Sequence, residues 1–111
     1  MRKKNYKGRC EKRALSKCIG VCRTYDALQY AYSDMLEGNE EVKEFQCNVP
    51  LSSEEYTTDF FCEKVNGDVM VRECVLRKHI SKPMTVKLLD ISREYWLRHG
   101  VSDWGLVIDE E

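Results

Sequence analysis

The sequence lacks long apolar runs, low-complexity segments and internal repeats. No stretch approaches the roughly 18 consecutive apolar residues that a membrane-spanning helix needs, so we expect no membrane association. No apolar run follows the basic residues 1–10, so the start of the chain does not have the pattern of a secretory signal. We therefore expect a cytoplasmic protein whose six cysteines are reduced thiols or metal ligands rather than disulfides.

The composition is that of an ordinary globular domain. The chain has 111 residues and a mass of 13.1 kDa, with 42% hydrophobic and 33% charged residues. A chain of this length typically forms one domain and buries roughly two thirds of the surface that its unfolded form exposes. The sequence is therefore long enough for a real hydrophobic core.

The net charge of -1 hides a strong asymmetry along the chain. Residues 1–23 carry nine Lys or Arg and one acid, whereas residues 24–73 carry twelve acids and three bases. This boundary separates a basic, cysteine-containing arm at 1–23 from an α/β domain at 24–111. Such an arm suits nucleic acid, because Lys and Arg neutralise phosphates, and the predicted contacts are Lys3, Lys4 and Arg9. The alternative is a solvated basic tail without a partner.

Hydrophobic periodicity and turn residues predict a helix, three strands, a second helix and a last strand. A short additional helix is predicted over 10–22, broken near Gly20, and Thr24 is predicted as the N-cap of the next helix. A helix between the third and fourth strands implies a right-handed crossover to a parallel neighbour. The fold class is therefore α/β, with a small mixed β-sheet flanked by helices. The six main elements are predicted over residues 25–37, 42–49, 56–63, 68–77, 83–99 and 104–108.

Two acidic residues fall on neighbouring predicted strands. Asp59 lies in the second strand and Glu73 in the third, and the intervening Asn66-Gly67 is a strong hairpin signal that brings them together. Glu73 interrupts an otherwise apolar strand face, where a carboxylate costs free energy unless it is paired or bound to a metal. Two close carboxylates favour a divalent cation, so the pair is a candidate metal site. The alternative is that Glu73 points outward and pairs with a lysine or arginine.

Four short motifs follow one another along the chain: YTTDF at 56–60, VRECV at 71–75, REYWL at 93–97 and GVSDW at 100–104. An upstream run, MLEGNEEVKEF at 35–45, leads into NVP at 48–50. In their order and spacing these segments resemble the TnsA-type endonucleases of transposons, which belong to the PD-(D/E)XK nuclease superfamily. The resemblance covers about residues 24–109.

The resemblance implies a restriction-endonuclease-like fold that hydrolyses nucleic-acid phosphodiesters. Asp59 would match the first motif aspartate and Glu73 the acidic residue of the second motif, both as ligands of Mg²⁺ or Mn²⁺. The main-chain carbonyl of Cys74 would supply a further ligand. The metal would polarise the scissile phosphate and help to produce a hydroxide nucleophile.

Two positions depart from the family's pattern. The lysine expected two residues after Glu73 is Val75, which can neither orient water nor stabilise a developing charge. The glutamate expected on the first helix is matched by Gln29, which brings no charge. Lys87 on the following helix, or Arg77, could supply the missing cation. The resulting prediction is a TnsA-like endonuclease with the catalytic set Asp59, Glu73, Gln29 and Lys87.

The same departures motivate an alternative from another class. The chain could be a non-catalytic nuclease-fold protein, of phage or mobile-element origin, that binds DNA or a partner protein. In either case a basic loop after the third strand would meet the phosphate backbone. A domain this small can hardly enclose a duplex alone, so a homodimer or a larger assembly is expected. The basic loop contributes the predicted contacts Arg77, Lys78 and Lys82.

The cysteines near the start of the chain form a second candidate site. In a helical segment Cys18 and Cys22 would lie one turn apart and could face one Zn²⁺ ion. A zinc-stabilised regulatory module is thus a third possible function. The alternative is that the cysteines are small buried apolar residues. The zinc ligands would be Cys10, Cys18 and Cys22, with a fourth from Cys47, Cys62 or His79.

Overall fold

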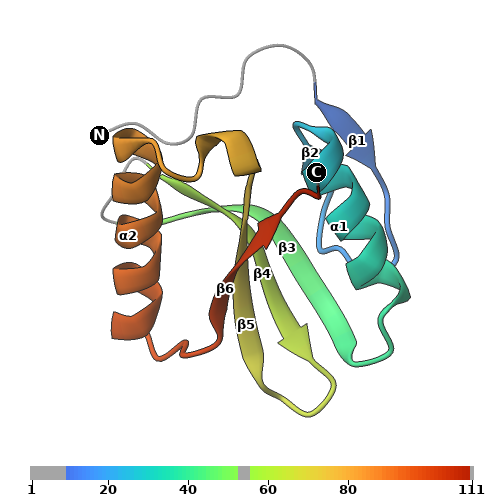
Figure 1. The fold of residues 1–111 in the computed structure, drawn as a ribbon. Coiled ribbons are helices and arrows are strands. Elements are labelled where there is room, and N and C mark those ends of the chain that lie inside the picture. Colours follow the sequence, from blue (N-terminus) through green and yellow to red (C-terminus); the bar gives the residue numbers. More distant parts are fainter. Residues whose placement is uncertain (1–9, 53–55, 111) are drawn as a thin grey trace.

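The computed structural model describes residues 10–52 and 56–110. Two helices and a four-stranded sheet make up most of the domain, and a small two-stranded hairpin precedes them (Figure 1). A single 3₁₀ turn, η1, connects the sheet to the second helix. The elements are β1 (Glu11–Arg13), β2 (Cys22–Thr24), α1 (Ala27–Gly38), β3 (Val42–Pro50), β4 (Thr57–Lys64), β5 (Val69–Val75), η1 (Arg77–His79), α2 (Pro83–Arg98) and β6 (Trp104–Ile108).

The main sheet has the order β3-β4-β5-β6. The first three strands form an antiparallel meander, and β6 lies parallel to β5. The tight turn between β4 and β5 contains Gly67 with φ 94°, a conformation that glycine adopts without strain. Helix α2 makes the crossover from β5 to the parallel β6. The predicted small mixed sheet flanked by helices is therefore confirmed.

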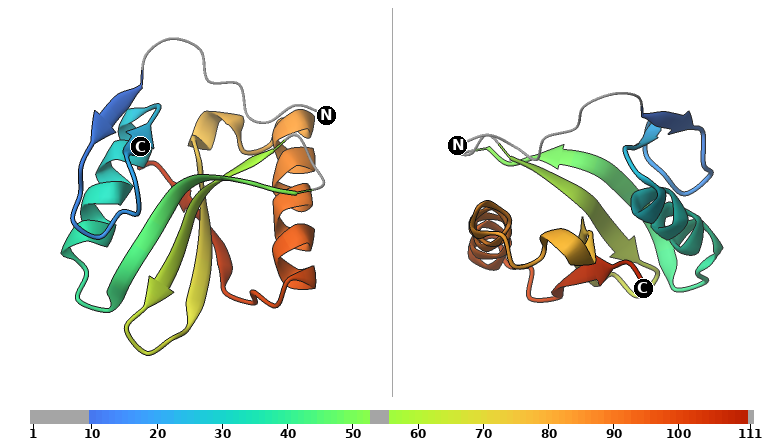
Figure 2. Two further views of the ribbon diagram at one scale, coloured as in Figure 1. Left: turned by 180° about the vertical axis from the view of Figure 1, so that it is seen from behind. Right: turned by 45° about the horizontal axis from the view of Figure 1, so that its top comes forward.

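The two helices pack on opposite faces of the sheet (Figure 2). On the α1 side, Leu36 of the helix packs with Phe45 and Phe60 of the sheet. On the α2 side, Leu88 and Trp96 belong to a second buried cluster that includes residues of β5. The central strands are thus covered on both faces, and no residue of β4 or β5 is exposed.

The bounds of the six main elements lie within two residues of their predicted positions. The last strand, 104–108, has the predicted bounds. The start of α1 differs because Asp26, not Thr24, is its N-cap. The Asp26 side chain accepts a hydrogen bond from the Gln29 amide, which is the usual way to satisfy a free donor in the first turn.

The predicted helix over 10–22 is wrong, because this segment forms the β1–β2 hairpin. The loop between the strands turns at Gly20, which has φ 79°, and Cys18 forms an isolated bridge with Phe45 of β3. Backbone groups of this segment thus form hydrogen bonds with residues distant in the sequence instead of the local hydrogen bonds of a helix. Residues 1–9, with the predicted phosphate contacts Lys3, Lys4 and Arg9, lie outside the described residues.

Within residues 10–52 and 56–110, no helix combines the length and the apolar character that crossing a membrane would require.

Candidate functional site

The structure brings Asp59 of β4 together with Glu73 of β5. The Asp59 amide donates to Oε1 of Glu73 at 3.0 Å, and the Cys74 amide donates to Oδ2 of Asp59 at 2.8 Å. Each carboxylate therefore accepts a hydrogen bond from the backbone of the opposite strand. The Asp59 and Glu73 side chains are 2% and 0% exposed, so the pair lies inside the protein.

At a break in the sheet, the backbone amides of Asp59 and Cys74 donate to these carboxylates rather than to carbonyls of the neighbouring strand. The β4–β5 ladder ends one step before Asp59 and Glu73 would face each other. The β3–β4 ladder also skips the step at Asp59, where the opposing residue is Asn48. Asn48 has φ 57°, in the left-handed region that asparagine tolerates better than most residues. Asp59 thus sits at an irregular point of both ladders.

The same break changes which face of the sheet the neighbouring side chains occupy. Residues two apart on a regular strand share a face. Here Phe60 packs in the cluster on the α1 side, whereas Thr58 accepts a hydrogen bond at 2.7 Å from Nε1 of Trp96 on α2. Asp59 lies at the point where the facing switches. Its carboxylate is accordingly directed at the backbone of β5.

Glu73 is held from the α2 side by a short hydrogen-bond chain. Oγ of Ser92 donates to Oε2 of Glu73 at 2.6 Å, and Nε1 of Trp104 donates to Oγ of Ser92 at 3.0 Å. Ser92 is fully buried on α2, and Trp104 begins β6. A buried carboxylate is tolerated when such donors surround it. Four elements, β4, β5, α2 and β6, thus fix the position of Glu73.

The donor set of this acidic pair fits a hard divalent cation. Carboxylate oxygens are ligands that Mg²⁺ and Mn²⁺ prefer. Cys74, whose amide already holds Asp59, is the residue whose carbonyl the family resemblance offers as a third ligand. Both residues are almost fully buried, so the pair lies beneath the protein surface rather than in an open cleft.

Gln29, the predicted match for the helix glutamate, is 2% exposed at the start of α1. Its side-chain Oε1 accepts a hydrogen bond from the Tyr25 backbone amide at 2.9 Å, while the Gln29 backbone amide donates to Oδ1 of Asp26. This reciprocal arrangement is similar to a capping box, in which the third helical residue reaches back to the chain ahead of the helix. Gln29 therefore has a structural role at the N-terminus of α1.

The two candidate replacements for the motif lysine lie in different environments. Val75 itself is 5% exposed and packed in the core. Lys87 is exposed on α2, five residues before Ser92, which places it about 140° around the helix from the residue that contacts Glu73. Arg77 is also exposed, and its backbone amide and Nε donate to Asp109 beyond β6. The structure thus gives Lys87 a position on the far side of α2 from the acidic pair.

The basic loop predicted to contact phosphates is an exposed part of the surface. Arg77, Lys78 and Lys82 are all exposed, and they lie in and just after η1. The loop follows β5 directly, so it begins two residues after Val75, at the end of the strand that carries Glu73. The side chains of this loop therefore lie at the protein surface.

Three cysteines from separate segments form a second cluster. The Sγ atoms of Cys22 and Cys47 lie 3.3 Å apart, those of Cys18 and Cys47 lie 3.8 Å apart, and all three lie within 4.8 Å of one another. These thiols are close enough to bind a metal ion. Cys10, a predicted ligand, is not part of this group. Among the described residues, Cys62 and His79 do not join it either.

The three thiols have different acidities. The hydrogen bond that Cys47 donates lowers the pKa of Cys22 to about 6, and Ser33 and the positive charge of Arg13 act in the same direction. Burial raises the pKa of Cys18 to about 11. The pKa of Cys47 is raised because its proton is held in the bond to Cys22. One thiolate, at Cys22, is therefore the favoured charged member of the cluster.

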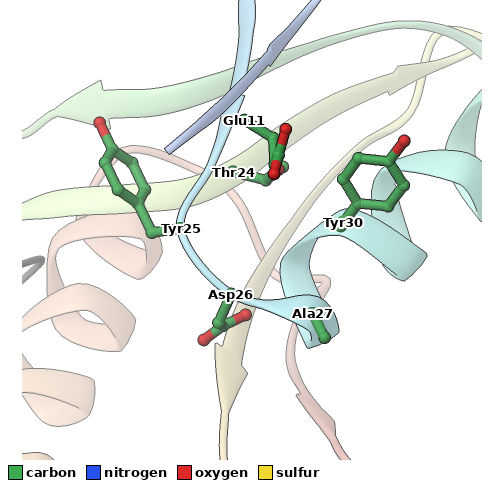
Figure 3. A pocket seen from close by; sticks show the side chains of 6 residues that line it. All are labelled: Glu11, Thr24, Tyr25, Asp26, Ala27 and Tyr30. Atoms are coloured by element: carbon green, nitrogen blue, oxygen red, sulfur yellow. The ribbon is translucent and has the colours of Figure 1, made fainter. Parts of the chain in front are cut away.

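A cavity of about 550 Å³ lies where the β1–β2 hairpin meets the start of α1. Tyr25 and Tyr30 stand on either side of it, with Glu11 and Asp26 between them (Figure 3). Among the described residues that line this cavity, none is basic. The lining is therefore unsuited to a phosphate, and the cavity is separate from the acidic pair.

A comparison with models of known protein families found no match, and a comparison with curated proteins found none either. The assignment of a function therefore depends on the geometry of the two clusters and on the motifs in the sequence.

Proposed function

We propose that the protein hydrolyses phosphodiester bonds of nucleic acid, as a small TnsA-like nuclease that uses Mg²⁺ or Mn²⁺ held by Asp59 and Glu73. The observation that carries this proposal is the meeting of the two carboxylates at a break between neighbouring strands. The hydrogen bonds from Cys74 and Ser92 fix one oxygen of each acid. One or two carboxylates, with waters and substrate phosphates, are the usual ligands of a catalytic Mg²⁺.

The fold supports the same proposal. The elements α1, β3, β4, β5, α2 and β6 form a four-stranded mixed sheet between two helices. This architecture is compatible with the restriction-endonuclease-like fold that the motifs imply. The two acids lie on the two central strands of this sheet, and the exposed basic loop follows one of those strands.

A divalent cation bound there would polarise the scissile phosphate and lower the pKa of a bound water. The chain's own residues position this chemistry. Ser92 restrains Glu73, and the Cys74 amide restrains Asp59, so the two ligands need little reordering when an ion binds. Arg77, Lys78 and Lys82 would contact the nucleic-acid backbone and hold it near the end of β5.

A second candidate function is a nuclease-fold protein that binds nucleic acid without cleaving it. Two observations favour it: an apolar Val75 packed in the core at the position of the motif lysine, and Lys87 on the opposite side of α2. Phosphodiester hydrolysis usually needs a positive charge near the transferred phosphate. In this alternative, Asp59 and Glu73 would only hold β4 and β5 together at the break in the ladder.

Nicking of supercoiled plasmid DNA tests the proposal. The full chain is incubated with Mg²⁺ or with Mn²⁺, alongside the variants Asp59→Asn and Asp90→Asn. Asp90 is an exposed carboxylate on α2, so its variant is the matched control. We expect nicking by the wild type and by Asp90→Asn, and loss of at least 100-fold of the rate in Asp59→Asn, by analogy with the loss of other electrostatic stabilising groups.

Binding separates the two candidate functions. Fluorescence anisotropy with duplex and single-stranded DNA and RNA is measured on the same preparations. Tight, salt-sensitive binding with no nicking under either metal would reject the enzyme and support the binding module. The absence of both binding and nicking would reject both candidates.

A further inference from the structure

The three-thiol cluster of Cys18, Cys22 and Cys47 has the dimensions of a zinc site. Zinc binds thiolate sulfur at about 2.3 Å in a tetrahedron, which places neighbouring sulfurs about 3.8 Å apart. The Cys18–Cys47 separation is 3.8 Å and the Cys22–Cys47 separation is 3.3 Å. The third pair lies within 4.8 Å. An ion at the centre of the group therefore requires shifts of about 1 Å or less.

The backbone, rather than the thiols themselves, brings the three residues together. The loop that carries Cys18 is bonded to β3 on both sides: the Ile19 amide donates to the Phe45 carbonyl at 2.8 Å, and the Phe45 amide donates to the Lys17 carbonyl at 2.9 Å. Cys47 lies two residues beyond Phe45 on β3. The site is thus preorganised, and little conformational entropy remains to be lost when an ion binds.

The surroundings suit a group of thiolates. Arg13 lies directly opposite Cys22 in the β1–β2 ladder, and its guanidinium contacts Ser33 of α1. Three thiolates and one Zn²⁺ carry a net charge of -1, which the positive charge of Arg13 offsets. Cys62, by contrast, is a buried cysteine of β4 that lies outside the three-thiol group.

We propose that Cys18, Cys22 and Cys47 bind one Zn²⁺ as thiolates, with the fourth position available to water. Each thiol that binds loses its proton to solvent, and no oxidation takes place. The ion joins the β1–β2 loop, β2 and β3, so it fixes the N-terminal hairpin to the edge strand of the main sheet. This site is independent of the acidic pair and does not depend on the nuclease proposal.

The experiment measures metal content and thiolate ligation of the full chain. The protein is purified in reductant, and its zinc is quantified after gel filtration by elemental analysis. We expect one Zn²⁺ per chain in the wild type. The variants Cys18→Ser, Cys22→Ser and Cys47→Ser should each fall below a tenth of that content, while Cys62→Ala should keep it. Asp59→Asn should also keep its zinc, which separates this site from the proposed catalytic centre.

Replacement by cobalt gives a readout that requires no variant. Co²⁺ added to the metal-free wild type should produce a sulfur-to-cobalt charge-transfer band that saturates at one equivalent and disappears when Zn²⁺ is added. Absence of that band would overturn the proposal even if a cysteine variant fails to fold. Zinc retained by any of the three serine variants, or lost equally by Cys62→Ala, would also overturn it.

Discussion

Replacing Ser92 by alanine tests the network that positions Glu73. The Ser92 hydroxyl is fully buried, donates to Glu73 and accepts from the indole of Trp104. Alanine is smaller by one oxygen atom and can make neither bond. The substitution therefore removes a donor from a buried carboxylate oxygen and an acceptor from an indole N–H.

The expected loss of stability follows from these two groups. Leaving a buried polar group without its partner costs about 1–3 kcal/mol, and more when the group is charged. Trp104 is only partly buried, so water compensates part of its loss, and the carboxylate of Glu73 contributes most of the effect. We expect Ser92→Ala to lower the free energy of unfolding by about 2–4 kcal/mol. At roughly 4–6 °C per kcal/mol for a domain of this size, the melting temperature should fall by about 8–24 °C.

Urea denaturation followed by circular dichroism measures this loss. Ser102→Ala, at an exposed serine in the loop before β6, is the control and should change the free energy of unfolding by less than about 0.5 kcal/mol. The double variant Ser92→Ala, Trp104→Phe has no indole N–H left without an acceptor, so Ser92→Ala should cost less in that background than in the wild type. A loss below about 1 kcal/mol in the single variant would refute the buried network as the support of Glu73.

Three further predictions follow from the same structure. Val75→Lys should raise the rate of metal-dependent nicking, because the new ammonium lies on the same strand face as Glu73. Val75→Met, tested in the same plasmid assay, should leave the rate unchanged, and equal rates in the two variants would contradict the reasoning. Changing Lys78 and Lys82 to alanine should reduce the slope of log affinity against log salt by about 0.9 for each duplex phosphate that is no longer neutralised, as anisotropy titrations would show, and an unchanged slope would remove this loop from the interface. The hydrogen bonds from Ser16 and Lys17 lower the pKa of Glu37 in the folded protein. The ionised Glu37 carboxylate therefore stabilises the fold at pH values above its unfolded pKa, and this stabilisation is lost as the pH falls through its folded pKa. Glu37→Gln should therefore reduce the fall in melting temperature on acidification from neutral pH through the range in which carboxylates titrate, and an unchanged pH profile would argue against this role.

The sequence predicted the main sheet because its elements have strong local signals. These signals are local, because each involves only a few neighbouring residues, and the tertiary structure agrees with them. They are the alternation in 69–75, the Asn66-Gly67 turn and the proline at the start of α2. The prediction for the segment 10–22 was wrong because the structure of this segment depends on distant partners. Its loop pairs with β3, and the Glu37 carboxylate of α1 accepts from the Ser16 and Lys17 amides, interactions that no local pattern contains.

The sequence could predict that Asp59 and Glu73 lie close together, but not which groups surround them. Two acids flanking a hairpin turn must lie close across the strands, and this much follows from the register. The ladder breaks at Asp59 opposite Asn48 of β3, which has a left-handed backbone, and no pattern in β4 or β5 reveals this. Ser92 was also missed, although a serine four residues after Leu88 on the buried stripe of a helix indicates a polar partner across the interface.

The cysteine cluster shows how a correct pair can be predicted from the wrong geometry. Cys18 and Cys22 do meet, but through an extended strand and a loop rather than through one helical turn. Because the segment is not helical, Cys10 falls outside the group, and Cys47, which was expected only as one possible fourth ligand, becomes a central member with the shortest sulfur distance.

The two candidate sites therefore share a physical origin. At the acidic pair, the ladders are interrupted where Asp59 lies opposite Asn48. At the cysteine cluster, β3 keeps its regular pairing with β4 and gains a second neighbour through the bridge between Cys18 and Phe45. Both arrangements place a polar or thiol group against a second element, and they are set by tertiary contacts that hydrophobic periodicity does not encode.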